Sequence, residues 1–271
     1  MSEEAPDILQ QITSKLTLSH LLDDPRATGK GVKVCVIDSG IDRPTIADRC
    51  LGRQQPIPEI QGGIFLAGNS EPLPYEGQPS TPHGTTVADI ILPIAPEIEL
   101  FSADVFGPQG TSEIECVLRA LHWAIHVWKC KVINLSLGVT EQRLQPVQRR
   151  NQMMRAIEDG YFQDVLLVAA AHHDHPFERR YPAVLSPPLL SVDKGDFSSQ
   201  HGFLYHLREK VEFQAYSRGY CGPFADEPAT SWAAPHLSGL VACLCSLRPG
   251  LKPFEAKTLL YWMSQEPTSE S

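Results

Sequence analysis

Short apolar runs that alternate with longer helical segments place the strongest constraint on the fold of this chain. Four of these runs are strand candidates: VKVCVID (32–38), IELFSADVF (98–106), KVINLSL (131–137) and DVLLVAAA (164–171). The helical segments 112–129 and 145–159 lie between them. An order of strand, helix and strand predicts parallel pairing, so we expect an α/β fold with a mainly parallel central sheet flanked by helices in three layers.

The segment 112–129 shows the helical pattern most clearly. Its apolar residues recur at intervals of three and four, and they are Ile114, Val117, Leu118, Leu121, Ile125 and Trp128. Thr111 or Ser112 precedes them in the position of a helix cap. Residues 6–22 have a similar amphipathic pattern, which predicts a helix that packs on the core.

Length and charge limit the classes of protein to which this chain can belong. A chain of 271 residues with 42% hydrophobic side chains suits one large domain. The formal net charge of −9, without a stripe of Lys and Arg, argues against nucleic acid as a partner. No apolar stretch approaches the roughly 20 residues that span a bilayer, so no membrane partner is expected either. The oligomeric state is left open.

Two features indicate a cytoplasmic protein. The N-terminal stretch MSEEAPDILQQITSKL begins acidic and has no apolar core, so it does not resemble a signal peptide. The seven cysteines are scattered along the chain without metal-ligand spacing, which suits free thiols in a reducing compartment.

Three polar residues occupy positions at which chemistry can take place. Asp38 ends the first strand candidate within DSGID, where Gly40 permits a tight turn. His83 stands in TPHGTTVADII, at the start of an apolar helical run. Ser231 stands in ATSWAAPHLSG at the entry to an apolar helix, whose N-terminal end stabilises a developing alkoxide. Each residue taken singly has an ordinary alternative as a turn former or a helix cap.

Taken together, the segments DSGID, HGTTVA and TSWAAPHLSG resemble the three signature blocks of the subtilisin-like serine peptidases. The resemblance covers about residues 29 to 250 and includes the order of the blocks along the chain. It implies a subtilisin-like three-layer fold and a serine endopeptidase that works through an acyl-enzyme intermediate. It also implies that Asp38 orients the general base His83, and that Ser231 is the nucleophile.

The resemblance extends to the segments between these blocks, and it implies where a substrate binds. Two stretches of the family's substrate cleft match this chain, and they provide the residues Gly110, Thr111, Ser136, Leu137 and Gly138. The expected partner is a peptide or protein substrate, which binds between these stretches as an added strand.

The chain departs from the family at the residue that stabilises the oxyanion. The family has alanines followed by Gly-Asn, whereas this chain has three alanines followed by His172 and His173. In the simplest register His173 takes the position of the Asn, and we hypothesise that it donates a hydrogen bond from a ring nitrogen instead. Loss of one such donor costs about a hundredfold to a thousandfold in turnover, a magnitude that comes from subtilisin itself. A slow or conditionally active enzyme is therefore expected.

Three further departures lie close to the triad blocks. Ala229 stands where the family has Gly, Trp232 follows the nucleophile where Met is usual, and Thr86 replaces a second His. Ala229 would crowd the nucleophile turn if this position needed an unusual backbone angle. Trp232 would partly cover Ser231.

The start of the resemblance divides the chain into an N-terminal helical extension, residues 1–28, and a peptidase domain, residues 29–271. The extension is too short for the folding prodomain of secreted relatives, so an intracellular type without a prodomain is expected. The connection between VADII and IAPEIEL is too short for the calcium-binding loop of those relatives.

Accordingly, we expect no metal and no cofactor. The cluster His172, His173, Asp174 and His175 has residue types that suit zinc, but adjacent residues rarely point at one ion, and a polar rim of the cleft is the simpler reading.

Two other functions stay open at this stage. A pseudopeptidase would keep the cleft as a peptide-binding module, which the departures from the family support. An esterase or peptide ligase would share the acyl-enzyme chemistry and differ only in the acceptor. Retention of Asp38, His83 and Ser231 in one chain favours an active peptidase.

Overall fold

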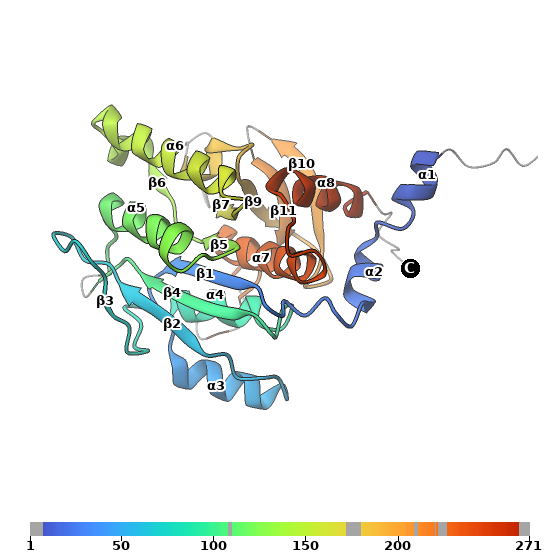
Figure 1. Cartoon of the computed structure of the whole chain (residues 1–271), viewed down its shortest axis with the longest axis horizontal. Coiled ribbons are helices and arrows are strands. Elements are labelled where there is room, and N and C mark those ends of the chain that lie inside the picture. The colour runs from blue at the N-terminus through green and yellow to red at the C-terminus, as the bar shows by residue number, and fades with distance from the viewer. Residues whose placement is uncertain are drawn as a thin grey trace, which may run out of the picture.

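A twisted sheet runs through the middle of the molecule in the computed structural model, which describes residues 8–107, 110–171, 180–208, 211–219, 221 and 227–265 (Figure 1). Seven neighbouring strands of the sheet are parallel, and one antiparallel strand closes each edge. In spatial order the strands are β10 (Phe203–Arg208), β11 (Val211–Tyr216), β9 (Leu190–Gly195), β7 (Leu166–Ala170), β5 (Val132–Leu135), β1 (Lys33–Asp38), β4 (Glu99–Asp104), β2 (Ile60–Ile64) and β3 (Leu73–Pro74). A separate short pair joins β6 (Val139–Thr140) to β8 (Arg180–Tyr181).

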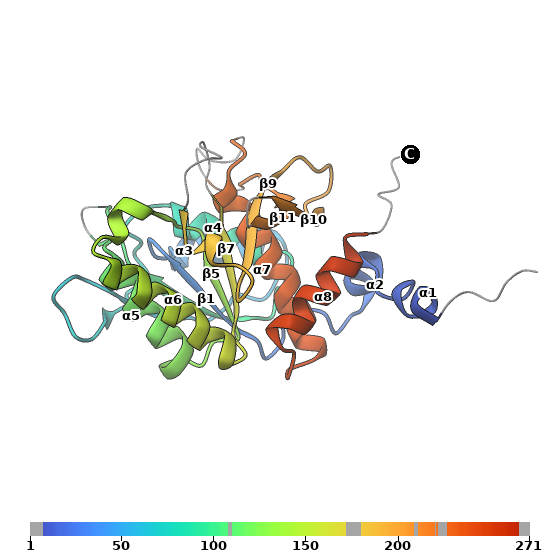
Figure 2. The ribbon, with the colours of Figure 1, turned by 90° about the horizontal axis from the view of Figure 1, so that it is seen from above.

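Helices cover both faces of this sheet, as Figure 2 shows from above. The helices of the described residues are α1 (Ile8–Thr13), α2 (Leu18–Asp23), α3 (Arg43–Gly52), α4 (His83–Ile91), α5 (Ile114–His122), α6 (Val147–Phe162), α7 (Thr230–Leu247) and α8 (Pro253–Met263). Of these, α1 stands away from the sheet. A π-helical turn, Trp123–Val127, continues α5, and short 3-10 turns occupy Glu141–Leu144 and Ala183–Leu185. The result is the three-layer arrangement that the sequence predicts.

The side chains of the central strands alternate between the two faces of the sheet, which produces two separate hydrophobic cores. In β1, Val34 and Val36 belong to the core beneath α4 and α7, whereas Cys35 and Ile37 belong to the core beneath α5 and α6. Successive side chains of a strand point to opposite faces, so a strand covered by helices on both sides is apolar throughout. This explains why β1 reads as an unbroken apolar run in the sequence.

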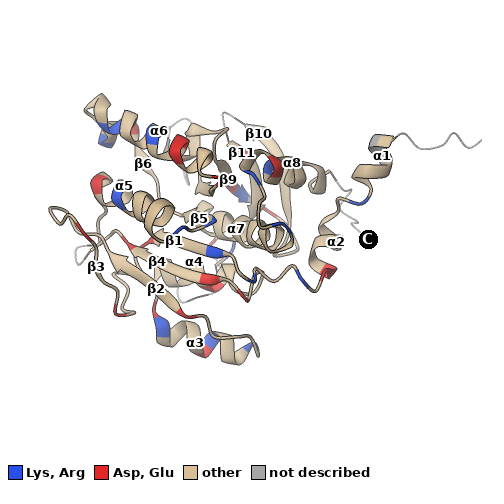
Figure 3. Cartoon of the chain, in the orientation of Figure 1, with Lys and Arg blue, Asp and Glu red and all other residues tan. Residues whose placement is uncertain are grey.

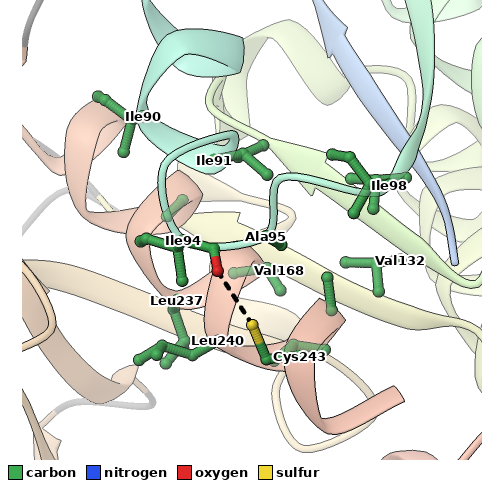
Figure 4. Packing of buried hydrophobic residues seen from close by; sticks show 14 of the residues in the cluster. Ile90, Ile91, Ile94, Ala95, Ile98, Val132, Val168, Leu237, Leu240 and Cys243 are labelled. Carbon is green, nitrogen blue, oxygen red and sulfur yellow. Dashed lines mark hydrogen bonds between the residues drawn. The ribbon is translucent and has the colours of Figure 1, made fainter. Parts of the chain in front are cut away.

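The first core is centred on α7, which is buried along nearly its whole length. Ile94, in the turn after α4, packs against α7 at Gly239, where an added Cβ would lie 2.8 Å from the Cβ of Ile94. The Cys243 thiol donates a hydrogen bond to the Ile94 carbonyl over 3.2 Å, and Leu237 and Leu240 lie in the same layer (Figure 4). This packing holds the helices α4 and α7 side by side.

The expected strands at 32–38, 98–106, 131–137 and 164–171 are confirmed as β1, β4, β5 and β7. The single helix expected at residues 6–22 is wrong, because α1 and α2 are separate helices. Thr17 has extended backbone between them, and its hydroxyl accepts from the His20 N–H and caps the second helix. The cap expected at Thr111 or Ser112 is also wrong, since α5 is preceded by Glu113 without a side-chain cap.

No helix of the described residues is long and apolar enough to cross a bilayer. Acidic and basic side chains are interspersed, for example along α3 and α6 (Figure 3).

Leu240→Ala should lower the free energy of unfolding by about 2–5 kcal/mol, because Leu240 is 1% exposed and its loss leaves a cavity between α7 and the sheet. Urea denaturation measures this change. The matched control is Leu51→Ala on α3, where Leu51 is 63% exposed and the change should stay within about 0.5 kcal/mol. Equal losses in the two variants would contradict the assignment of α7 to the core.

Candidate active site

Asp38 is the last residue of β1, in the middle of the sheet, and its side chain is fully buried. A buried carboxylate needs hydrogen-bond donors, and Ser39 supplies two of them. The Ser39 N–H donates to Asp38 Oδ1 over 2.7 Å, and the Ser39 hydroxyl donates to the same oxygen over 3.1 Å. These contacts fix the orientation of the carboxylate at the carboxyl end of the sheet.

His83 is the first residue of α4, as the sequence predicts, and its ring lies directly against Asp38. The Nδ1 atom of His83 is 2.8 Å from Oδ1 and 2.9 Å from Oδ2 of Asp38. A carboxylate can only accept, so Nδ1 carries the proton and Nε2 of the neutral ring is left as an acceptor. The pair therefore holds the imidazole in one tautomer and one orientation.

The close approach of α4 to β1 depends on Gly84. A Cβ at this position would lie 2.3 Å from the Gly40 carbonyl oxygen and 3.2 Å from Asp38 Oδ1. Gly40 itself has a φ of +89°, which a glycine adopts without strain. Two glycines thus bring the beginning of α4 into contact with the end of β1.

The pKa of His83 is raised above its ordinary value by two opposing effects. Burial of the ring lowers the pKa, since it disfavours the charged form. The charge of Asp38 and its hydrogen bond raise the pKa, and together they outweigh burial. The site therefore favours the protonated form of His83 more than water does.

Ser231 is the second residue of α7. Its hydroxyl donates to the Ser136 carbonyl over 3.3 Å, and the Ser136 hydroxyl donates to the Ser231 carbonyl over 2.9 Å. The next residue, Trp232, has its ring centroid 4.8 Å from that of His83. The structure thus brings all three predicted residues, Asp38, His83 and Ser231, to the same edge of the sheet.

A buried polar chain supports Ser136, and the sequence analysis missed it. The Ser238 hydroxyl donates to Asn134 Oδ1 over 3.0 Å, and Asn134 Nδ2 donates to the Ser136 hydroxyl over 2.9 Å. Asn134 and Ser238 are fully buried in β5 and α7. The sequence carried a signal for it, since Asn134 interrupts an apolar strand and Ser238 an apolar helix. Buried polar groups are nearly always hydrogen-bonded, so such residues indicate polar partners within the core.

The predicted substrate-binding residues occupy two stretches near this edge. Ser136, Leu137 and Gly138 follow β5 directly, and Ser136 is 3% exposed. Gly110, with a φ of +65°, and Thr111 lie in the exposed turn before α5. A Cβ on Gly110 would meet the side chain of Thr81, two residues before His83, at 3.9 Å.

The departures near the triad have structural explanations. Ala229 precedes α7 with a φ of −139° and a ψ of 151°, which is extended backbone that any residue adopts, so it causes no crowding. Thr86 is buried, and its hydroxyl donates to the Pro82 carbonyl over 3.2 Å within the first turn of α4. Trp232 is also buried and packs against the imidazole.

His173 lies outside the described residues, as does the rest of the cluster His172, His173, Asp174 and His175. Among the residues that the structure describes, no group of three or more His, Cys, Asp or Glu side chains is arranged to hold a metal ion. All seven cysteines are described, and all are free and buried.

Comparison with known proteins identifies the family. The model of the subtilase family matches residues 29–188. The chain belongs to the subtilase family. Subtilisin E from Bacillus subtilis (strain 168) is 28% identical to this subtilase over 243 residues, which cover 82% of this chain and 57% of that protein. Subtilisin from Bacillus pumilus is also 28% identical, over 82% of this chain and 79% of its own length.

Solved structures show the same fold as this subtilase. A lanthipeptide protease superposes with a TM-score of 0.65 at 21% identity, over 92% of this chain and 84% of that one. A cold adapted subtilisin-like serine proteinase gives a TM-score of 0.63 at 20% identity, over 90% of this chain and 86% of that one. These similarities confirm the subtilisin-like three-layer fold. The subtilase spans little more than half, 57%, of the length of Subtilisin E.

Asp38→Asn should lower the pKa of His83, because the charge that raises it is lost while the burial that lowers it stays. An NMR titration of the His83 ring, assigned with a His83→Ala variant, measures the change. Asp159→Asn is the matched control, since Asp159 contacts a different imidazole, that of His126. An unchanged pKa in Asp38→Asn would contradict the pairing.

Proposed function

We propose that this chain is a serine endopeptidase in which Asp38, His83 and Ser231 form the catalytic triad. The observation that carries the proposal is the contact of His83 Nδ1 with both carboxylate oxygens of Asp38, at the edge of the sheet where Ser231 opens α7. Membership of the subtilase family and the similarity to named subtilisins support it.

The proposed reaction begins with proton transfer from Ser231 to His83. The Nε2 atom of His83 removes the hydroxyl proton as Ser231 Oγ attacks the carbonyl carbon of a peptide bond. The proton then passes to the leaving amine, which departs and leaves an acyl-enzyme. Water repeats the sequence, with His83 again as the base, and releases the acid product.

Asp38 would stabilise the imidazolium that forms in each half of this reaction. It keeps its own charge and remains hydrogen-bonded to Ser39 throughout. The weak hydrogen bond from Ser231 to the Ser136 carbonyl must be given up when the hydroxyl turns towards His83. The polar chain through Asn134 and Ser238 would hold Ser136 in position during that change.

Substrates of this enzyme would be peptides or extended segments of proteins. They would bind as an added strand between residues 110–112 and residues 136–138, with main-chain hydrogen bonds for affinity and side-chain pockets for preference. We further propose that residues 29–271 form the peptidase domain, that residues 1–28 pack on it, and that the protein acts in the cytoplasm. Seven free cysteines support a reducing compartment.

Ser231→Ala should abolish labelling by a fluorophosphonate probe at neutral pH, because the alanine has no oxygen to form the covalent bond with phosphorus. Gel fluorescence of the labelled protein measures the result. The matched control is Ser19→Ala on α2, an exposed serine whose loss should leave labelling intact. If wild type and Ser231→Ala are labelled equally, Ser231 is not an activated nucleophile, and a peptide-binding pseudopeptidase becomes the better account.

The proposed oxyanion stabilisers are the Ser231 backbone N–H and a ring nitrogen of His173. His173→Ala should therefore lower kcat by about a hundredfold to a thousandfold with little change in KM. His173→Asn should restore much of the loss, because the Asn amide is also a donor. His175→Ala serves as the control in the same segment. No change in turnover for either His173 variant would exclude this role.

A further inference from the structure

The imidazole of His83 has a second neighbour besides Asp38, the indole of Trp232. The two ring centroids are 4.8 Å apart, and the ring planes are tilted by 35°. Trp232 is 2% exposed, and its Nε1–H donates to the Glu227 carbonyl over 3.0 Å. Burial and this hydrogen bond fix the indole in the first turn of α7, so that its ring stands against the imidazole.

We infer that Trp232 is a positioning residue that stabilises the imidazolium form of His83 through the face of its indole. Its consequence for turnover rests on the proposed peptidase function. An indole is the best of the protein aromatic rings for binding a cation, and a centroid separation below about 6 Å is within range. The positive charge on His83 appears when Ser231 gives up its proton. The indole would therefore act in both halves of the reaction, wherever His83 carries the proton.

The described charged groups near His83 either contact the edge of its ring or are engaged by other residues. Asp38 on β1 is an acidic group in direct contact with the ring, and it acts at Nδ1, on the edge of the ring. Asp104 on β4 lies beside Asp38 in the sheet. Its carboxylate accepts hydrogen bonds from the Ser80 hydroxyl and from the Phe106 N–H.

The described residues of α4, of α7 and of the segment just before α7 add three further groups. Asp89 lies at the far end of α4 and is paired with Arg53 over 2.7 Å. On α7, burial lowers the pKa of His236 to about 4, so this ring is neutral near pH 7. Glu227 reaches the site through its backbone carbonyl, which holds the indole.

Asp38 and Trp232 thus favour the same protonation state from different directions. The carboxylate acts at the ring edge and the indole at the ring face, so loss of either contact should lower the pKa of His83. A cation–π contact corresponds to a shift of about half a pKa unit at an exposed site and about one and a half where the cation is desolvated. General-base catalysis needs the neutral ring, so the activity of the wild type should fall as the pH drops through this raised pKa.

The test compares Trp232→Leu, which removes the ring, with Trp232→Phe, which keeps an aromatic face. Trp232→Leu should lower the pKa of His83, measured by NMR, by about half a unit or more, and the acidic limb of kcat/KM should move down by the same amount. Trp232→Phe should keep most of the wild-type pKa. Trp262→Leu on α8 is the matched control and should change neither measurement.

A second measurement does not depend on how well these variants fold. All four tryptophans can be replaced by trifluorotryptophan, which keeps the ring shape but removes electron density from its face. This labelled protein should also show a lowered pKa of His83. An unchanged pKa in both Trp232→Leu and the fluorinated protein would overturn the inference, as would equal shifts in Trp232→Leu and Trp232→Phe. A shifted pKa in a chain without peptidase activity would support the ring contact and refute the proposed function.

Discussion

The contact between His83 and the buried carboxylate of Asp38 is the interaction on which the rest of this site depends. A fully buried charge is stable only where donors surround it, and here Ser39 and the imidazole supply them. The contact requires the beginning of α4 to approach the end of β1 more closely than any side chain at Gly84 would allow. The backbone of the site is therefore adjusted to one hydrogen-bonded pair, and the tautomer of His83 follows from it.

The opposite side of the site is set by α7 and β5. Reciprocal hydrogen bonds join Ser136 to Ser231, and the chain through Asn134 to Ser238 ties this contact into the core. A satisfied buried network has one preferred geometry, because any rearrangement leaves a donor or acceptor unpaired. Sheet and helix are thus held in register at the residue that we propose as the nucleophile, and the indole beside it closes the face of the imidazole.

The sequence predicted the central strands well because their apolar runs are buried on both faces. It did not predict β9, β10 and β11, whose residues are partly exposed and mix polar with apolar types, so that their periodicity is weak. The N-terminal helix of residues 6–22 was predicted from amphipathic spacing alone. The capping hydrogen bond at Thr17 divides it into α1 and α2, and the spacing of apolar residues carries no information about such a break.

The sequence by itself determined the chemical types, the order of the motifs and the local positions of the site residues: Asp38 at a strand end, and His83 and Ser231 at helix starts. Apolar periodicity, glycine and helix-entry patterns act over a few residues, so they can be read from the chain. Only the tertiary structure decided which groups face one another. The hydrogen bond between Asn134 and Ser238 and the packing of the Trp232 indole against His83 join segments far apart in sequence. The ordinary backbone angle at Ala229 depends on how those segments pack.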